Sequence, residues 1–293
     1  MAERAKQSPG TLFCFGLGYS AGFLARTLRD EGWRVIGTCR EARGEAHLRA
    51  EGFEVHRLER GHSLAEARVL LGDATHVLSS VPPDEAGDPV LDLHGADLAA
   101  AAPQWVGYLS TTGVYGDRGG GWVDEGSALE PTGERGRRRV EAERRWLDLW
   151  RRHGLPVHVF RLAGIYGPGR SALDAVRGGH AQRIDKPGQV FSRIHVADIV
   201  QALRASMAAP DPGSVYNLCD DDPAPPAEVI AYAAELLDAA LPPLVPFEAA
   251  ALSEMARSFY ADNKRVSNRR LKERLGVRLL YPSYREGLRA LLR

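Results

Sequence analysis

The sequence lacks the features that mark secreted, metal-binding or membrane proteins. Its 293 residues include only three cysteines, Cys14, Cys39 and Cys219, and no CxxC pair. This number and spacing argue against a disulfide framework or a zinc site, and no HExxH motif is present. The apolar run at residues 12–17 is too short for a signal-peptide core or a membrane span. We therefore expect a cytoplasmic protein and predict no metal site.

The sequence also lacks an excess of charge of either sign. Lys and Arg total 38, as do Asp and Glu, so the formal net charge is zero. A neutral chain has no global field that attracts nucleic acid or an anionic membrane. The arginine-rich stretch at residues 134–145 has no interleaved aromatic residues that could stack on bases. The expected partner is a small-molecule substrate, and the expected state is a monomer or homodimer.

What the sequence does contain is an alternation of strand-like and helix-like segments. Strands alternating with helices indicate an α/β fold with a doubly wound parallel sheet of the Rossmann type. The long polar helix over residues 134–153 is expected to place Val140, Leu147 and Trp150 near one face. The patterns predict strands at residues 11–16, 34–37, 75–81, 106–110 and 156–162, and a first helix at 21–29.

After residue 166 the pattern loosens. A Gly-rich loop is expected over residues 167–192, and a helix over 227–240 between two proline-rich segments. We predict a dinucleotide-binding domain over residues 1–165 that also receives 194–218. Most of residues 166–293 would then form a smaller C-terminal substrate-binding lobe.

A glycine-rich turn joins the first predicted strand to the first predicted helix. In FGLGYSAG, Gly16, Gly18 and Ala21 fit the GxGxxG/A dinucleotide fingerprint. Gly16 would allow the tight turn, Gly18 the approach of the backbone to a pyrophosphate, and Ala21 close helix packing. The phosphates would lie against free N–H groups at the helix N-terminus. We predict a cofactor site that includes Gly16, Gly18, Tyr19, Ser20 and Ala21; an ordinary strand–helix turn is the alternative.

The end of the second strand indicates which dinucleotide is bound. An NAD site usually carries Asp or Glu there, whereas this sequence reads Gly-Thr-Cys-Arg over residues 37–40, with Arg43 close behind. A guanidinium can pair with a 2′-phosphate that a carboxylate would repel. Arg40 therefore favours NADP(H) over NAD(H). The alternative is that Arg40 is a solvated loop residue and Glu41 contacts the ribose.

Several later segments resemble the extended short-chain dehydrogenase/reductase superfamily, the NAD(P)-dependent epimerase/dehydratase group. The resemblance covers nearly the whole chain, and the two-spaced glycines are similar to its atypical branch. The matching segments are LSTTGVYG at residues 109–116, RLAGIYGPGR at 161–170, IHVADI at 194–199, VYNL at 215–218, and the C-terminal NKRVSNRRLKERLG followed by YPSYREGL.

The resemblance implies roles for individual residues. Thr111 aligns with the Ser or Thr that hydrogen-bonds the substrate hydroxyl or carbonyl in the family. Gly164 and Ile165 fall where the family's backbone meets the nicotinamide carboxamide, and Arg193 and His195 where members contact substrate or brace the site. Tyr166 lies in the same group of motifs. Four further residues fall where the fourth strand passes the cofactor ribose: Ser79, Ser80, Val81 and Pro82.

The family's catalytic Tyr-x-x-x-Lys pair is missing. Its Tyr-Gly-x-x-Lys pattern lines up with Arg135, Gly136 and Arg139. In the family the phenol transfers a proton at the carbinol carbon, while the lysine holds the ribose and lowers the pKa of the phenol. Arg139 could still hold the ribose, but Arg135 cannot act as a general base because a guanidinium stays protonated.

Substitutes for the missing tyrosine exist near the predicted pocket. Tyr115, Tyr166 and His195 are the candidates; the alternative is that the tyrosines pack against cofactor or loops and that His195 hydrogen-bonds backbone. Most arginines of the long helix are expected to be solvated, with an i,i+4 pair from Glu141 to Arg145.

Two functions therefore stay open. The first is an NAD(P)(H)-dependent oxidoreductase or epimerase-like enzyme acting on a small polar substrate such as a sugar derivative, with Thr111, Tyr115 and Arg139 as catalytic candidates. The second is a non-catalytic NADP(H)-binding protein that senses redox state and relays it to a partner. The enzyme should oxidise NADPH with a suitable substrate, whereas the sensor should bind cofactor without turnover.

Overall fold

The structure, a computed structural model, describes residues 9–292. They form two compact units that interleave along the sequence. The first unit runs up to Ser110 and includes Glu141–Phe160 and Leu203–Val215. The second comprises Thr111–Val140, Arg161–Ala202 and the residues from Tyr216 onward. No single position separates the units, and the predicted boundary at residue 165 stays a prediction.

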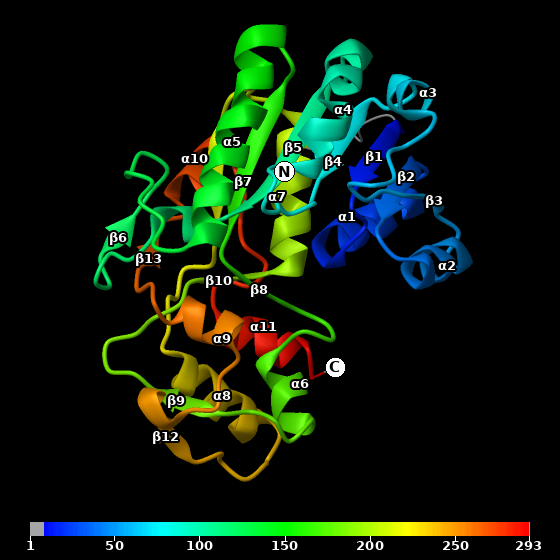
Figure 1. The fold of residues 1–293 in the computed structure, drawn as a ribbon. Helices are drawn as coiled ribbons and strands as arrows, with labels where there is room; N and C mark the ends of the chain where they lie inside the picture. The colour runs from blue at the N-terminus through cyan, green and yellow to red at the C-terminus, as the bar shows by residue number, and fades with distance from the viewer. Residues whose placement is uncertain (1–8, 293) are drawn as a thin grey trace. The chain divides into compact units, whose positions relative to one another are not determined.

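Parallel strands form the base of the first unit. The pairs β1–β2, β2–β3, β1–β4 and β4–β5 all run parallel. The full sheet has the order β11-β7-β5-β4-β1-β2-β3, so the winding reverses between β1 and β4 (Figure 1). This order confirms the predicted doubly wound α/β fold. The strands are β1 (Thr11–Phe15), β2 (Arg34–Cys39), β3 (Glu54–Arg57), β4 (His76–Ser79), β5 (Trp105–Thr111), β7 (Val157–Leu162) and β11 (Val215–Leu218).

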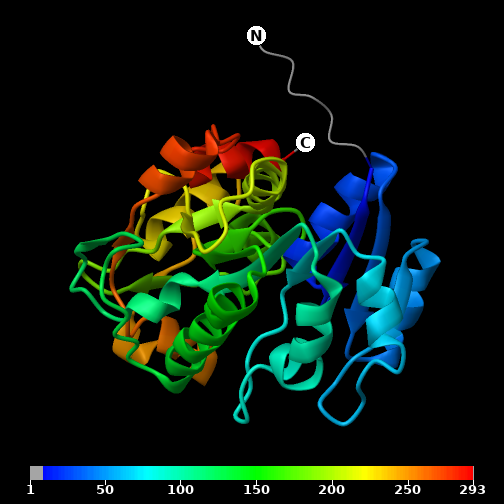
Figure 2. The ribbon, with the colours of Figure 1, turned by 90° about the horizontal axis from the view of Figure 1, so that it is seen from above.

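Helices cover these strands and close an apolar core. Phe13, Val77 and Val106 of the sheet are fully buried in one cluster with Val90 of α4 and Trp146 of α5. Figures 1 and 2 show α4 beside α5 in both views. The helices are α1 (Tyr19–Asp30), α2 (Ala42–Ala50), α3 (Ala67–Gly72), α4 (Pro89–Ala101), α5 (Glu134–His153) and α7 (Val196–Ala208).

Helix α5 has the predicted bounds, and two residues of its predicted apolar face, Val140 and Leu147, pack against buried clusters. Trp146 and Glu143 are buried, whereas Trp150 is 36% exposed. The indole of Trp146 stacks on Tyr108, and Glu143 accepts a short hydrogen bond from buried Ser110. The predicted face was wrong for Trp150 alone. Hydrophobic periodicity also missed Glu143, because a polar residue that is buried with a partner gives no apolar signal.

The second unit consists of short elements. Tyr166, Leu173, Val229, Tyr284 and Leu288 form one of its buried clusters. Three parallel strand pairs are present: β8 (Gly164–Tyr166) with β10 (Arg193–His195), β9 (Arg183–Asp185) with β12 (Leu244–Pro246), and β6 (Trp122–Val123) with β13 (Arg265–Val266). The helices are η1 (Thr112–Tyr115), α6 (Ala172–Arg177), α8 (Pro226–Leu236), η2 (Phe247–Ala249), α9 (Glu254–Phe259), α10 (Arg269–Leu275) and α11 (Tyr284–Ala290).

The predicted Gly-rich loop over residues 167–192 was wrong in part, because α6 and β9 lie within it. The hydroxyl of Ser171 accepts a hydrogen bond from Asp174 N–H and starts α6. Elements of six and three residues are too short to show a periodicity. Within the described part of the chain, no helix is both long and apolar enough to cross a membrane.

Candidate functional site

The glycine turn is held by the ends of two neighbouring strands. Gly16 N–H donates to Thr38 Oγ1 of β2 (2.8 Å), and Ser80, just after β4, donates from its hydroxyl to Gly16 O (2.6 Å). Gly16 has a φ of +82°, and a Cβ there would lie 2.9 Å from Ser80 Oγ. Glycine at this position is therefore required by the protein itself. Sequence reasoning missed Thr38, whose role depends on the parallel pairing of β1 with β2.

Gly18 differs from Gly16 because nothing in the protein requires it to be glycine. Its φ of −80° is open to any residue, and the nearest atom to an added methyl group would be Ser80 Oγ at 4.0 Å. Gly18 is the N-cap of the twelve-residue helix α1, which has no side-chain cap and no acidic residue in its first turn. The first N–H groups of α1 therefore have no capping side chain at Gly18 and no neighbouring carboxylate in the first turn, which fits a phosphate.

The remaining predicted residues of this turn surround the same helix start. Ser20 and Ala21 are buried in the first turn of α1, and the ring of Tyr19 lies edge-on to Phe23 (5.1 Å between centroids). Ser79, at the end of β4, is fully buried, and its hydroxyl has no partner among the residues that the structure describes. Val81 packs near Gly16, and Pro82 is exposed.

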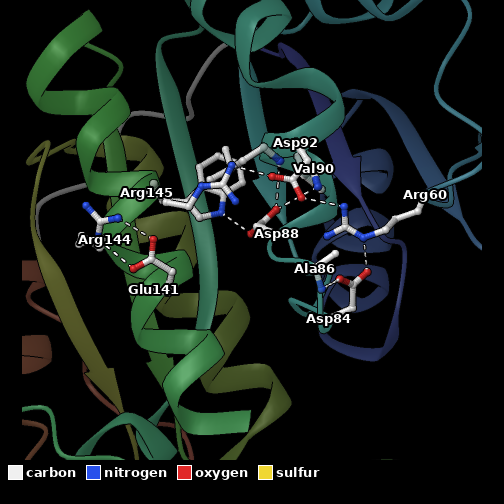
Figure 3. Close-up of polar contacts among 11 residues, drawn as sticks. Arg60, Asp84, Ala86, Asp88, Val90, Asp92, Glu141, Arg144 and Arg145 are labelled. Carbon is white, nitrogen blue, oxygen red and sulfur yellow. Dashed lines mark hydrogen bonds and ion pairs between the residues drawn. The ribbon is translucent and has the colours of Figure 1, made fainter. Parts of the chain in front are cut away.

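A set of connected ion pairs holds the loop over residues 80–88 (Figure 3). Arg60, which follows β3, donates to Asp84 (2.6 Å) and to Asp92 of α4 (2.7 Å). Arg145 of α5 binds the other oxygen of Asp92 (2.7 Å). The hydrogen bond from Arg60 lowers the pKa of Asp84. Three segments of the first unit are thus fixed around the loop that holds Gly16.

The loop ends at Asp88, which is buried and starts α4. Its carboxylate accepts hydrogen bonds from Val90 N–H (2.9 Å), Leu91 N–H (3.1 Å) and the indole N–H of Trp146 (2.8 Å). The predicted pair of Glu141 with Arg145 was wrong. Arg145 reaches Asp92 instead, and Glu141 pairs with Arg144 (2.6 Å), as Figure 3 shows.

Both candidate ribose-binding residues stand at the end of β2. Arg40 and Glu41 are 77% and 72% exposed and pair with each other at 3.2 Å. An exposed ion pair between adjacent residues is weak and exchanges readily with a stronger partner. The geometry therefore leaves open which of the two contacts a cofactor.

In the second unit, Thr111 starts η1. Its Oγ1 accepts a hydrogen bond from Gly113 N–H (3.1 Å), and its own hydroxyl hydrogen donates to no described residue. Gly136 of α5 packs closely on this segment, since a Cβ there would lie 2.6 Å from Pro131 and 3.1 Å from Gly113 O. The positions of the missing catalytic pair are thus on a helix that packs against η1.

The two arginines at those positions differ. Arg135 is exposed, and its guanidinium lies 5.5 Å from the ring of exposed Phe259. Arg139 is half-buried and already interacts with another group of the protein. A guanidinium cannot act as a general base, so Arg135 does not supply the acid–base group that the family resemblance places at this position.

Tyr115 is not the accessible proton donor that we expected. It is fully buried, its hydroxyl donates to Asn217 (2.7 Å), and it accepts from Arg161 (2.9 Å). Burial raises the pKa of Tyr115 to about 12, although the Arg161 charge opposes the shift. Both hydrogen-bonding functions of the phenol are thus used inside the protein, and the residue has a structural role.

The other two candidate proton donors are also buried. Burial lowers the pKa of His195 to about 4, so the imidazole is neutral near pH 7 and does not titrate in the expected range. Its Nδ1 accepts from Ala197 N–H (3.1 Å), while its Nε2 has no partner in the described chain. Burial raises the pKa of Tyr166, whose hydroxyl reaches Ser283 O at 3.4 Å.

The predicted residues of β8 and β10 are brought together by strand pairing. Gly164 and Ile165 pair with Arg193 and Ile194, and Tyr166 pairs with His195. Gly164 N–H donates to Ser192 O (3.1 Å), just before β10. Ile165, Tyr166 and Arg193 line one pocket, whereas His195 packs behind it against Tyr166 and Tyr281.

Comparison with known proteins identifies relatives over most of the chain. No family model matches it. The chain is 30% identical over 236 residues to Protein YeeZ of Escherichia coli strain K12, covering 74% of this chain and 79% of that one. A conserved Silicibacter pomeroyi protein of unknown function is 56% identical, with a TM-score of 0.89 over 97% and 98% of the two chains.

A solved enzyme has the same fold. The dTDP-glucose 4,6-dehydratase of Bacillus anthracis, solved in complex with NAD, superposes with a TM-score of 0.74 over 97% of this chain and 95% of that one. Its sequence identity is 16%, so the comparison concerns the fold. The agreement confirms the expected Rossmann-like architecture.

Proposed function

The chain belongs to one family with Protein YeeZ, and we propose that it is a member of the extended short-chain dehydrogenase/reductase superfamily that acts as an NADP(H)- or NAD(H)-dependent oxidoreductase or epimerase-like enzyme. Its substrate is a small polar molecule such as a sugar derivative. A nicotinamide cofactor supplies hydride-transfer chemistry when it is bound. The chain's own residues bind that cofactor, orient the substrate and exclude water.

One observation carries the proposal: the space beside Gly18. The protein has a glycine where its backbone is ordinary and where no neighbour lies closer than 4.0 Å to the position of a side chain. Gly72 is equally open, so the open space alone does not mark a site; what distinguishes Gly18 is that it is the N-cap of α1, directly after β1, where the fingerprint expects the pyrophosphate. The ligand that free amides at a helix N-terminus favour is an anion, and in this fold it is a dinucleotide pyrophosphate.

The proposal gives individual residues the following roles. The amides near Gly16 and Gly18 bind the phosphates, and Arg40 pairs with the 2′-phosphate of NADP(H) in exchange for its exposed contact with Glu41. Thr111 donates its free hydroxyl hydrogen to a substrate oxygen. Arg139 takes over ribose binding from the family's lysine, and Gly164 and Ile165 present backbone to the carboxamide.

A second candidate function rests on a specific observation. Arginine occupies both positions of the catalytic pair, and Tyr115, the nearest tyrosine of the motif, has its hydroxyl engaged by Asn217 and Arg161. A protein without an acid–base group can still bind NADP(H) and report redox state to a partner.

Calorimetry with NADPH, NADP⁺, NADH and NAD⁺ tests cofactor binding. Oxidation of NADPH, followed at 340 nm with a panel of carbonyl compounds and nucleotide sugars, then separates the two functions. The enzyme turns over with at least one panel member, and Thr111→Ala lowers that turnover. Cofactor binding without turnover, with a change of assembly between NADPH and NADP⁺, supports the sensor. A protein that binds none of the four dinucleotides refutes both.

A further inference from the structure

A pocket of about 500 Å³ lies within the second unit. One wall is apolar and comes from α8 and α11, with Val229, Ile230 and Leu288. The other walls carry polar side chains, among them Arg193 of β10 and Tyr284 at the start of α11. The pocket therefore combines an apolar surface with hydrogen-bond donors, as small-molecule sites do.

Arg193 is a cation without an ion-pair partner. Its Nη1 donates to two backbone carbonyls, Phe191 O (2.8 Å) and Ala224 O (3.0 Å), and no carboxylate of the described residues lies within ion-pair distance of it. Asp220 acts on it from farther away, and burial raises the pKa of Asp220, which weakens that carboxyl as a counter-ion. Burial lowers the pKa of Arg193, although a guanidinium remains charged. A largely desolvated charge is costly unless it is paired, so its presence at a pocket wall calls for an anion.

Tyr284 adds a second unmet group to the same pocket. Its side chain is 1% exposed, and its hydroxyl has no hydrogen-bond partner among residues 9–292. The one acid of the pocket lining, Asp174, already accepts a hydrogen bond from Ser171 (2.6 Å). Buried hydroxyls are rarely left unpaired. The Tyr284 hydroxyl thus lacks a hydrogen-bond partner, Arg193 lacks a carboxylate within ion-pair distance, and both residues line this pocket.

We propose that this pocket binds the acidic group, a carboxylate or a phosphate, of a small molecule whose apolar part packs on Val229, Ile230 and Leu288. Arg193, which its two carbonyl contacts hold in place, pairs with the acidic group. Tyr284 donates a hydrogen bond to the same acidic group. In so far as this molecule is the substrate, the inference rests on the proposed function. The inference then means that the substrate is an anion rather than a neutral sugar.

Three probes of similar shape test the charge requirement: phenyl phosphate, benzoate and the neutral benzamide. Calorimetry or ligand-observed NMR on the full chain should show that one or both acids bind and that benzamide binds at least about tenfold more weakly, or about 1.4 kcal/mol. The ratio of the Kd for phenyl phosphate to the Kd for benzoate distinguishes a phosphate site from a carboxylate site. Equal binding of benzamide, or no binding of either acid, overturns the proposal.

Variants locate the site. Arg193→Met should weaken the better acid at least about tenfold, and Tyr284→Phe, which keeps the ring, should weaken it less. The matched control is Arg257→Met, because Arg257 also donates to a carbonyl, Ala250 O (3.1 Å), and stacks on a ring, Phe247, but does not line the pocket. The affinity of this control variant for the acid should equal that of the wild type.

Two further outcomes are decisive. Wild-type affinity in a folded Arg193→Met protein overturns the proposal; if that variant does not fold, Tyr284→Phe and the benzamide comparison decide. NADPH is titrated into the same samples. Loss of acid binding with NADPH binding intact is the expected result for Arg193→Met. If the wild type binds the acids but no dinucleotide, the proposed function is refuted, whereas the proposal that this pocket binds an acidic group stands.

Discussion

Gly18→Ala should abolish tight dinucleotide binding while leaving the fold intact. The φ of −80° suits alanine, and the new methyl would contact nothing closer than 4.0 Å. A glycine-to-alanine change at a compatible position gains about 0.4–1 kcal/mol through the unfolded chain. The poorer helix N-cap costs about as much, roughly 1 kcal/mol. The free energy of unfolding should therefore change by no more than about 1 kcal/mol.

The effect on binding should be much larger. The methyl would stand between the backbone and a pyrophosphate that must approach it closely, so the Kd for NADPH should rise at least about tenfold, equivalent to about 1.4 kcal/mol. Calorimetry gives the Kd, and urea denaturation of the same preparation gives the stability.

Two other glycines serve as controls. Gly72→Ala also adds a methyl in open space, at the end of α3, and should raise the free energy of unfolding by about 0.4–1 kcal/mol while leaving the Kd unchanged. Gly16→Ala should destabilise the protein by about 1–3 kcal/mol, because its φ of +82° and the contact with Ser80 are both incompatible with a Cβ. If Gly18→Ala binds NADPH with the wild-type Kd, the turn does not hold a pyrophosphate and our interpretation of it is refuted.

Further predictions concern single residues. Asp88→Ala should lower the free energy of unfolding by about 2–4 kcal/mol in urea, since it removes the N-cap of α4 and leaves the buried Trp146 N–H unpaired; a loss below that range would show that water replaces the carboxylate. Tyr115→Phe should cost about 1–3 kcal/mol of stability with turnover unchanged, whereas lost turnover would restore it as proton donor. Arg40→Ala should weaken NADP⁺ but not NAD⁺, and the reverse pattern in Glu41→Ala would favour Glu41 as the ribose-binding residue. Burial raises the pKa of Asp220 to about 8, despite the opposing charge of Arg193, so the folded chain holds a proton that the unfolded chain releases near pH 4. Stability should therefore fall as pH rises between about 4 and 8. In thermal melts, the advantage of Asp220→Asn over the wild type should grow across that window, and a constant difference would contradict the shifted pKa.

Elements with a strong local signal could be predicted from the sequence. Strand β1, the glycine turn and α1 follow one another as the fingerprint requires, and the bounds of α5 match residues 134–153. The predictions weakened where partners are distant in sequence. Thr38 supports Gly16 across 22 positions, and Arg60 reaches Asp92 across 32. No local pattern records such a contact, because it depends on which strands the sheet places side by side.

The catalytic candidates show the same limit in a sharper form. A motif match placed Tyr115 in a site, but the phenol's chemistry depends on Asn217 and Arg161, which lie 102 and 46 positions away. The ionisation of His195 likewise depends on burial that its own motif does not encode. Sequence motifs thus indicate which segments approach a ligand, whereas protonation and hydrogen bonding depend on the packed environment. In our proposal, therefore, the buried Tyr115 and His195 do not act as acid–base groups, and Thr111 and the charge of Arg193 hold the substrate.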